Sequence, residues 1–239
     1  MTTTPLAPAP LFVETAPLER VTLDLYRNIH KAIRSEMFSV TLDAGRTAPD
    51  GDGLTAVADR LHGLVRLLVS HAEHEDEHVQ PHIERHAPTL AAIIERDHPV
   101  LESQLARLEV LADRAAGAAR AEQRAMAHRL YLSLSSFSAA YLVHQEFEEA
   151  VVMPALGDAM TVDELAAVEH AIVSSIPPDE MRVALSLMLP AMNVDDRTEL
   201  LSNMRAGAPP EVFAGVVALA ESVLERPDFV ELASRLDIV

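Results

Sequence analysis

The sequence has no cysteine and few basic residues, and both features limit what the protein can do. Without thiols, disulfides, thiolate zinc sites, iron–sulfur clusters and thiol catalysis are excluded. The 19 Lys and Arg residues stand against 37 Asp and Glu, which gives a formal net charge of −18. This charge disfavours nucleic acids and anionic membranes as partners, because both are themselves negative.

Long apolar runs and a secretory leader are also missing. The sequence has no stretch of about 18 consecutive apolar residues that could span a membrane. Residues 1–16 are rich in Thr, Pro and Ala, with neither a basic start nor a long apolar core, so we predict a flexible lead rather than a signal peptide. We therefore expect a cytoplasmic protein with no membrane partner.

Apolar residues at helical spacing account for most of the chain. They make up 49% of the 239 residues and recur at about 3.6 positions, as in an α-helix. The four long predicted helices span 18–43, 54–86, 87–117 and 121–155. Long helices with short links favour an all-α fold, an up-down-up-down four-helix bundle. We expect the bundle over 17–157 and a C-terminal helical extension over 158–239.

The extension at 158–239 shows helix-start signals but no cluster of reactive residues. Thr161 and Glu164 match a capping box, and Asp196 with Glu199 predicts another helix start of that type. The prolines at 177–178 are expected to end the helix that begins at Thr161, and a strongly apolar helix is expected over 181–192. Further starts are expected at the prolines in 209–210 and 227. The extension is expected to pack on the bundle, to mediate a homodimer or to bind a partner.

One short motif occurs twice in the chain. His71 is followed by Glu75, and His144 is followed by Glu148 at the same distance. Both copies continue with Val and Pro at equal offsets, namely Val79 with Pro81 and Val152 with Pro154. Residues four apart share one face of a helix, so each copy presents an imidazole and a carboxylate in one direction. Because proline lacks an N–H, the first copy should kink its helix.

Two single histidines complete the pattern. His30 precedes the first copy and His98 precedes the second, although Pro99 predicts a local bend at His98. Four imidazoles and two bridging carboxylates suit a pair of first-row transition metals, and two irons with an oxo or hydroxo bridge fit the charge. Zinc could occupy such a site without a redox role. The predicted metal ligands are His30, His71, Glu75, His98, His144 and Glu148.

With these residues the sequence resembles the hemerythrin-like proteins that carry an HHE cation-binding domain. The resemblance rests on the two His-x3-Glu motifs with their prolines and on His30 and His98, and it covers residues 17–157. It implies a non-haem di-iron site that binds, senses or reacts with oxygen, peroxide or nitric oxide. Family members that repair iron centres usually carry a cysteine, and marine oxygen carriers use a fifth histidine. Neither feature occurs here, which disfavours both roles.

Other motifs keep other functions open. His74 to His78 matches the HExxH pattern of zinc peptidases, although its two middle residues are acidic. Glu75-x2-His78 and Glu95-x2-His98 match the ExxH of ferritin-like bundles, but on adjacent helices. A di-iron oxygenase with an organic substrate, a peroxidase or catalase, and a redox-silent structural module are further alternatives.

The remaining histidines and two tyrosines have weaker signals. His78 and His82 lie near the face of His71, and we favour solvated positions for both over contact with metal. Four histidines are expected to face solvent or to point away from the site: His62, His74, His86 and His128. Tyr26 and Tyr141 each lie about one turn from a predicted ligand. They are expected to hydrogen-bond a bound oxygen species or to pack in the core.

Overall fold

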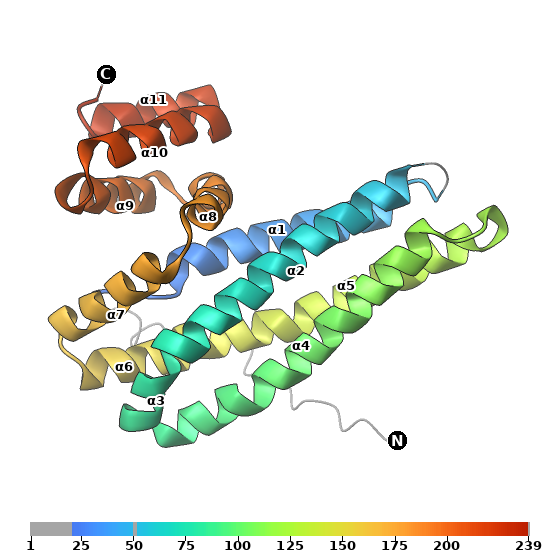
Figure 1. Ribbon diagram of the computed structural model, residues 1–239, viewed down its shortest axis with the longest axis horizontal. Coiled ribbons are helices and arrows are strands. Elements are labelled where there is room, and N and C mark those ends of the chain that lie inside the picture. The colour runs from blue at the N-terminus through green and yellow to red at the C-terminus, as the bar shows by residue number, and fades with distance from the viewer. Residues whose placement is uncertain (1–20, 50–51, 239) are drawn as a thin grey trace.

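The computed structural model describes residues 21–49 and 52–238, and every regular element in these residues is a helix. The lead predicted over 1–16 lies outside the described residues. Figure 1 shows an elongated bundle of long helices, with shorter helices gathered at one end. The expected all-α architecture is confirmed. None of the described helices is long and apolar enough to cross a membrane.

Four long helices form the body of the bundle. They are α1 (Arg27–Arg46), α2 (Gly53–His78), α4 (Pro88–Ala116) and α5 (Arg120–Phe147). Both α2 and α5 pack against α1 and against α4, so the helices close around one core (Figure 1). Leu61, Leu105 and Leu134 are among the buried aliphatic residues of this core. Removal of such apolar surface from water is the main stabilising contribution.

The first helix begins later than the sequence predicted. The predicted start near residue 18 is outside the described residues, and residues 21–26 are not helical. Asp24 explains the delay, because its side chain accepts hydrogen bonds from the backbone N–H groups of Tyr26 and Arg27, both at 3.0 Å. An aspartate that bonds nearby N–H groups competes with helix formation on its N-terminal side.

The prolines of both motif copies follow interruptions of regular helix. The second predicted helix divides at Val79 into α2 and α3 (Gln80–His86), with Pro81 in the first turn of α3. The expected kink is thus confirmed, since proline is tolerated where no N–H is needed. The fourth predicted helix is not one α-helix. It passes through a π-helical turn, η2 (Glu148–Val152), into α6 (Met153–Ala159).

Pro99 has a smaller effect than expected. α4 continues as one helix through this proline, and the predicted bend at His98 does not interrupt it. His98 is buried, so the residue stays on the face of α4 that points into the bundle.

The C-terminal region contains α7 (Val162–Ser175), α8 (Pro178–Ala191), α9 (Val194–Gly207), α10 (Pro210–Val223) and α11 (Arg226–Arg235). The capping box of Thr161 and Glu164 is confirmed by hydrogen bonds in both directions. The expected end of the helix before the prolines at 177–178 and the proline starts of α10 and α11 are also confirmed. α8 begins at Pro178, three residues before the start expected at 181. The start predicted at Asp196 is wrong, because Asn193 caps α9 by accepting from the Asp196 N–H at 2.9 Å.

Helices α8 to α11 form a lobe with its own buried cluster, which includes Leu189, Leu201 and Leu232. The lobe meets the bundle mainly where α8 packs on α1 (Figure 1). Lys31, the only lysine of the chain, forms an ion pair with Asp196. α7 differs from the lobe, because it contributes to a buried cluster at the end of the bundle. The domain boundary predicted at residue 157 stays a prediction.

Candidate metal centre

The six predicted ligands come together inside the bundle. His30 comes from α1, His71 and Glu75 from α2, His98 from α4, and His144 and Glu148 from α5 and the start of η2. Five of these residues are buried, and the side chain of His71 is 8% exposed. The cluster therefore joins all four long helices and is enclosed by them.

The histidines form two pairs, one on each side of the carboxylates. In the α1–α2 half, the Nε2 atoms of His30 and His71 lie 3.1 Å apart. In the α4–α5 half, the rings of His98 and His144 meet edge to face with centroids 5.0 Å apart. In each half, the histidine of the motif also contacts its own glutamate. His71 Nε2 lies 3.1 Å from Glu75 Oε1.

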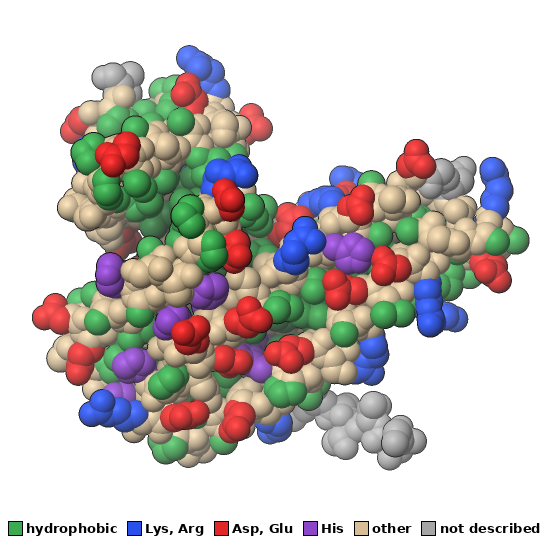
Figure 2. Space-filling model, in the orientation of Figure 1, with side chains coloured by type: hydrophobic (Ala, Val, Ile, Leu, Met, Phe, Trp, Pro, Cys, Tyr) green, Lys and Arg blue, Asp and Glu red, His purple; other side chains and the backbone are tan. Residues whose placement is uncertain are grey.

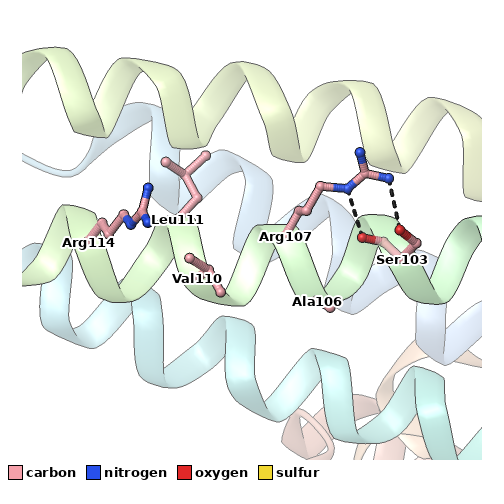
Figure 3. A pocket seen from close by; sticks show the side chains of 6 residues that line it. All are labelled: Ser103, Ala106, Arg107, Val110, Leu111 and Arg114. Atoms are coloured by element: carbon pink, nitrogen blue, oxygen red, sulfur yellow. Dashed lines mark hydrogen bonds between the residues drawn. The ribbon is translucent and has the colours of Figure 1, made fainter.

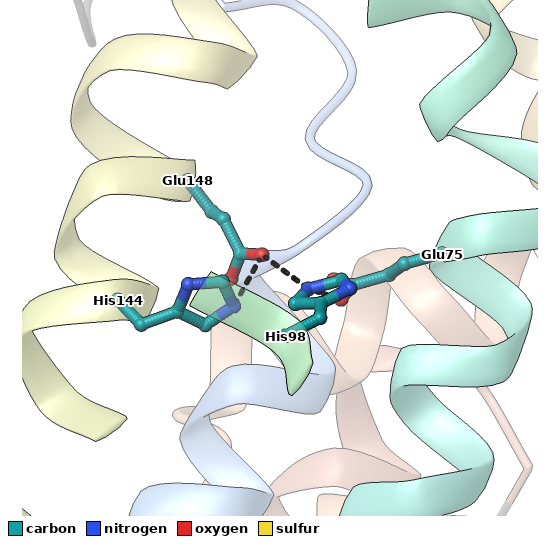
Figure 4. A group of neighbouring side chains, drawn as sticks. All are labelled: Glu75, His98, His144 and Glu148. Atoms are coloured by element: carbon teal, nitrogen blue, oxygen red, sulfur yellow. Dashed lines mark ion pairs between the residues drawn. The ribbon is translucent and has the colours of Figure 1, made fainter. Parts of the chain in front are cut away.

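Each glutamate faces both halves. Glu75 Oε1 is 3.9 Å from His30 Nε2, whereas Glu75 Oε2 is 3.9 Å from His98 Nε2. Glu148 Oε1 is 2.9 Å from His144 Nε2, whereas Glu148 Oε2 is 3.5 Å from His30 Nε2. Figure 4 shows Glu148 and Glu75 reaching toward His98 from opposite helices. Two carboxylates in these positions could bridge two cations.

The atoms that point into the cluster fit metal ions. Glu75 Oε1, Glu148 Oε2 and His98 Nε2 are buried and have no hydrogen-bond partner in the described part of the chain. Burial of unpaired polar atoms is costly, and metal coordination is one way to offset that cost. The ligand atoms form two close groups, one of Glu75, His98, His144 and Glu148 and one of His30, His71 and Glu75. Nitrogen and oxygen donors of this type suit first-row transition metals.

Two further carboxylates hold the single histidines. Glu149 Oε1 lies 2.8 Å from His30 Nδ1, and Asp76 Oδ1 lies 2.8 Å from His98 Nδ1. A carboxylate on the second ring nitrogen orients a ligand histidine and leaves Nε2 for the metal. Neither carboxylate was predicted from the sequence. The available signal was an acidic residue directly after each motif glutamate.

Asp76 and Glu149 each contact a histidine in the other half of the cluster. Asp76 belongs to the motif on α2 but contacts the histidine of α4, in the other half. Glu149 belongs to the second motif but contacts the histidine of α1. The acidic residue after each His-x3-Glu motif therefore contacts the single histidine of the other half.

The π-helical turn directs Glu148 and Glu149 to different neighbours. Glu148 is 1% exposed and faces the cluster, whereas the side chain of Glu149 is 25% exposed and faces α1. There Glu149 also accepts a hydrogen bond from Arg34 at 2.5 Å. Such single π-turns are frequent at functional sites, since the wider turn changes the direction of successive side chains.

Burial and charge shift the pKa values of the cluster in the metal-free state. Burial alone would lower the pKa of His30, but the hydrogen bond to Glu149 and the cluster carboxylates outweigh it and raise the pKa to about 9. The pKa of His98 also rises to about 9, because Glu148 and other carboxylates outweigh burial. Burial lowers the pKa of His71. Protons on these two histidines therefore partly compensate the charge of the carboxylates in the metal-free state.

The other histidines contact groups outside the cluster. His78 Nε2 lies 3.0 Å from Ser175 Oγ of α7, and His74 bonds the backbone carbonyl of Ser70. Figure 2 shows several histidines at the end of the bundle where α3 and α7 lie. His62 lies 3.3 Å from Asp113, while His86 and His128 are exposed.

The HExxH and ExxH patterns fit the structure less well than the doubled motif does. Neither ligand group in the described residues includes His74 or His78. The HExxH pattern is therefore less well supported than the doubled motif. Glu95 of the ExxH alternative is exposed, which also places it outside the cluster.

Both tyrosines lie beside the cluster. Tyr26 and Tyr141 are buried, with ring centroids 5.3 Å from the His30 ring and 5.9 Å from the His144 ring. Burial and the nearby carboxylates raise both pKa values, so the hydroxyl groups stay protonated. Their predicted hydrogen bond to a bound oxygen species stays a prediction.

Two hollows lie along α4, and only the smaller one is lined by residues of the cluster. The larger, about 720 Å³, is an open surface groove lined by residues of α4 alone. Figure 3 shows it, with Arg107 bonded to Ser103 and no histidine or carboxylate in the lining. The smaller, about 20 Å³, is lined by His98 and His144. The small cavity is the one connected with the candidate chemistry.

These features define a class: helical-bundle proteins with a buried cluster of histidines and glutamates that could bind metal. The family model described as "Hemerythrin HHE cation binding domain" matches residues 21–156, more than half of the chain. The chain therefore belongs to the hemerythrin HHE family, and the resemblance inferred from the sequence is confirmed. Neither a curated protein nor a solved structure matches the chain.

Proposed function

We propose that the protein is a non-haem di-iron protein that binds, senses or reacts with oxygen, peroxide or nitric oxide. The proposed ligands are His30, His71, Glu75, His98, His144 and Glu148. Two iron ions would supply one-electron redox chemistry and open positions for a small molecule.

The observation that carries this proposal is the position of the two glutamates. Glu75 and Glu148 each direct oxygens toward histidines of both halves. A single zinc with a tetrahedral ligand set would not need two carboxylates that span two histidine pairs. The geometry therefore favours two metals with shared ligands.

The surrounding residues have separate tasks. Glu149 and Asp76 orient His30 and His98 and increase their basicity toward metal. The aliphatic core next to the cluster, which includes Leu68 and Leu101, limits the access of water. Such exclusion strengthens electrostatic interactions within the site.

The size of the cavity favours a small molecule over an organic substrate. A space of about 20 Å³ beside His98 and His144 has room for about one water-sized molecule. Pockets for organic ligands are typically about 300–1,000 Å³. The oxygenase alternative would therefore require the helices to separate.

Metal analysis and visible absorption of the aerobically purified protein test this proposal. We expect about two irons per chain and charge-transfer bands that change on reduction and on addition of peroxide. One zinc per chain without visible absorption would contradict the di-iron proposal and favour the HExxH alternative. A protein that takes up no metal when iron is supplied would leave the cluster as a structural polar core.

A further inference from the structure

The C-terminal lobe of helices α8 to α11 packs separately from the bundle and rests on a helix that carries one ligand. The buried cluster of the lobe consists of residues from these four helices, and the two buried clusters of the bundle contain none of them in the described part of the chain. The lobe meets the bundle mainly through α1 (Figure 1). α1 therefore contacts the lobe on one face and directs His30 into the metal cluster on another.

Ion pairs between the lobe and α1 lie on both sides of His30. Lys31, the next residue, forms an ion pair with Asp196 of α9. Arg27 Nε lies 3.9 Å from Asp196 Oδ1, and a terminal nitrogen of Arg27 lies 3.6 Å from Glu199 Oε2. Arg27 begins α1, and His30 follows within one turn. The lobe thus contacts the same helical turn that carries the ligand.

The charges at the start of α1 favour this contact. α1 has no acidic residue in its first turn, and Arg27 and Lys31 lie near the positive end of its dipole, where cations are disfavoured. Asp24 precedes the helix but bonds backbone N–H groups rather than these side chains. In the described residues, both cations have their recorded ion-pair partners in the lobe, namely Asp196 and Glu199.

Asp196 is held from the lobe as well as from α1. Its backbone N–H donates to Asn193 Oδ1 at 2.9 Å in the first turn of α9, and its side chain is only 10% exposed. Burial of a carboxylate is costly unless the charge is paired. The adjacent Asp195 differs, because its side chain is 81% exposed and pairs with Arg235 inside the lobe. The two neighbouring aspartates therefore have different tasks.

We propose that Asp196 is a positioning residue of the metal centre, which fixes the first turn of α1 through Lys31 and Arg27 and thereby holds His30 in place. The lobe then completes the α1–α2 half of the site. Lobe docking and metal binding in this half strengthen each other by the same factor. This inference rests on the proposed di-iron function and gives the C-terminal lobe a task in it.

Binding of ferrous iron to the full chain, measured without oxygen by competition with a coloured chelator, tests this role. Asp196→Asn should weaken the binding of one of the two ions by about tenfold, equivalent to about 1.4 kcal/mol. The other ion should change by less than about twofold. Asp195→Asn is the matched control, because it removes the same charge from a residue whose recorded partner is in the lobe. It should bind both ions as the wild type does.

Combination with ligand substitutions separates positioning from a general loss of stability. In His30→Gln the remaining ion is held by the α4–α5 half, so adding Asp196→Asn should have little further effect. In His98→Gln the remaining ion is held by the α1–α2 half, so adding Asp196→Asn should have its full effect. Equal losses in both backgrounds would mean that the lobe acts through overall stability, and this would overturn the assignment.

Substitution of Lys31 tests the same contact from the bundle. Lys31→Met should weaken iron binding as Asp196→Asn does, whereas Lys31→Arg keeps the charge and should restore it. Hydrogen exchange gives a readout on the lobe itself. Iron should slow amide exchange in α8 of the wild type and have no such effect in Asp196→Asn. Exchange in α8 of the wild type that does not respond to iron would contradict the coupling.

The outcomes separate this inference from the function on which it rests. Normal iron binding by both Asp196→Asn and Lys31→Met, with two irons in the wild type, would overturn the positioning role and leave the di-iron function intact. A wild-type protein that takes up no iron would contradict the proposed function itself. If Asp196→Asn fails to fold, Lys31→Met decides.

Discussion

The two halves of the cluster share one sequence pattern but differ in their surroundings. In the α1–α2 half, His30 is fully buried, and its partner Glu149 is also bonded to Arg34. In the α4–α5 half, the partner of His98 is Asp76, whose side chain is 52% exposed. The cavity borders only this second half. An internal repeat can therefore supply equal ligands and still produce two inequivalent positions.

The largest expected effect comes from removing Glu148, a carboxylate that both halves of the cluster share. Glu148→Ala should reduce the metal content from about two ions per chain toward none, because Glu148 contacts histidines of both halves. Metal analysis after loading with iron gives the result. Glu146→Gln, in the last turn of α5, is the control and should retain both metals. If Glu148→Ala binds two metals, the bridging role is wrong.

A smaller effect is expected from the residues that orient the single histidines. Glu149→Gln and Asp76→Asn should each lower metal affinity, by about 10- to 100-fold. Glu149→Gln should have the larger effect, since Glu149 is less exposed than Asp76. Competition with a chelator measures both constants. Equal effects would show that exposure does not distinguish the two halves.

The pH dependence of the metal-free protein provides a third comparison. The pKa of His30 and of His98 is raised from 6.5 to about 9. Protonation of both residues therefore stabilises the fold fully below pH 6.5, and this stability is lost as the pH rises through about 9. We expect the free energy of unfolding to fall by roughly 3 kcal/mol per histidine over this window.

Denaturant titrations at several pH values, with and without metal, check this expectation. The metal-loaded protein should lack the decline, because coordinated histidines carry no titrating proton. Glu149→Gln should reduce the contribution of His30, to which Glu75 and Glu148 also add, and leave that of His98 unchanged. Stability of the metal-free protein that rises between pH 6.5 and 9 would contradict the assignment of the charged forms.

The smallest expected effect concerns Arg34, which has no recorded counterpart beside Asp76 in the described part of the chain. Arg34→Gln removes a partly exposed ion pair with Glu149, and such pairs contribute about 0.2–1 kcal/mol. We expect metal affinity to change by less than about fivefold. Arg107→Gln is a control for surface charge, because Arg107 is an exposed residue of α4 that bonds only Ser103 in the described part of the chain. A loss as large as that of Glu149→Gln would mean that Arg34 holds Glu149 in place.

Much of the site was predictable because its spacing is local. A histidine and a glutamate four residues apart meet on one face of any regular helix, so His71 with Glu75 and His144 with Glu148 follow directly from the sequence. The break before Pro81 was predictable for a similar reason, since it depends on a missing N–H. The late start of α1 and the cap of α9 depend on single polar side chains, Asp24 and Asn193, that compete with the backbone.

The sequence by itself determined most of the helices and the two motif copies, because each depends on residues within about one turn. Only the tertiary structure decided that Asp76 meets His98 and that Glu149 meets His30, since helix periodicity does not define how one helix is rotated against another. The cavity beside Tyr141 was likewise decided only by the tertiary structure. It depends on how closely side chains from three helices pack, and close packing is a property of the assembled core.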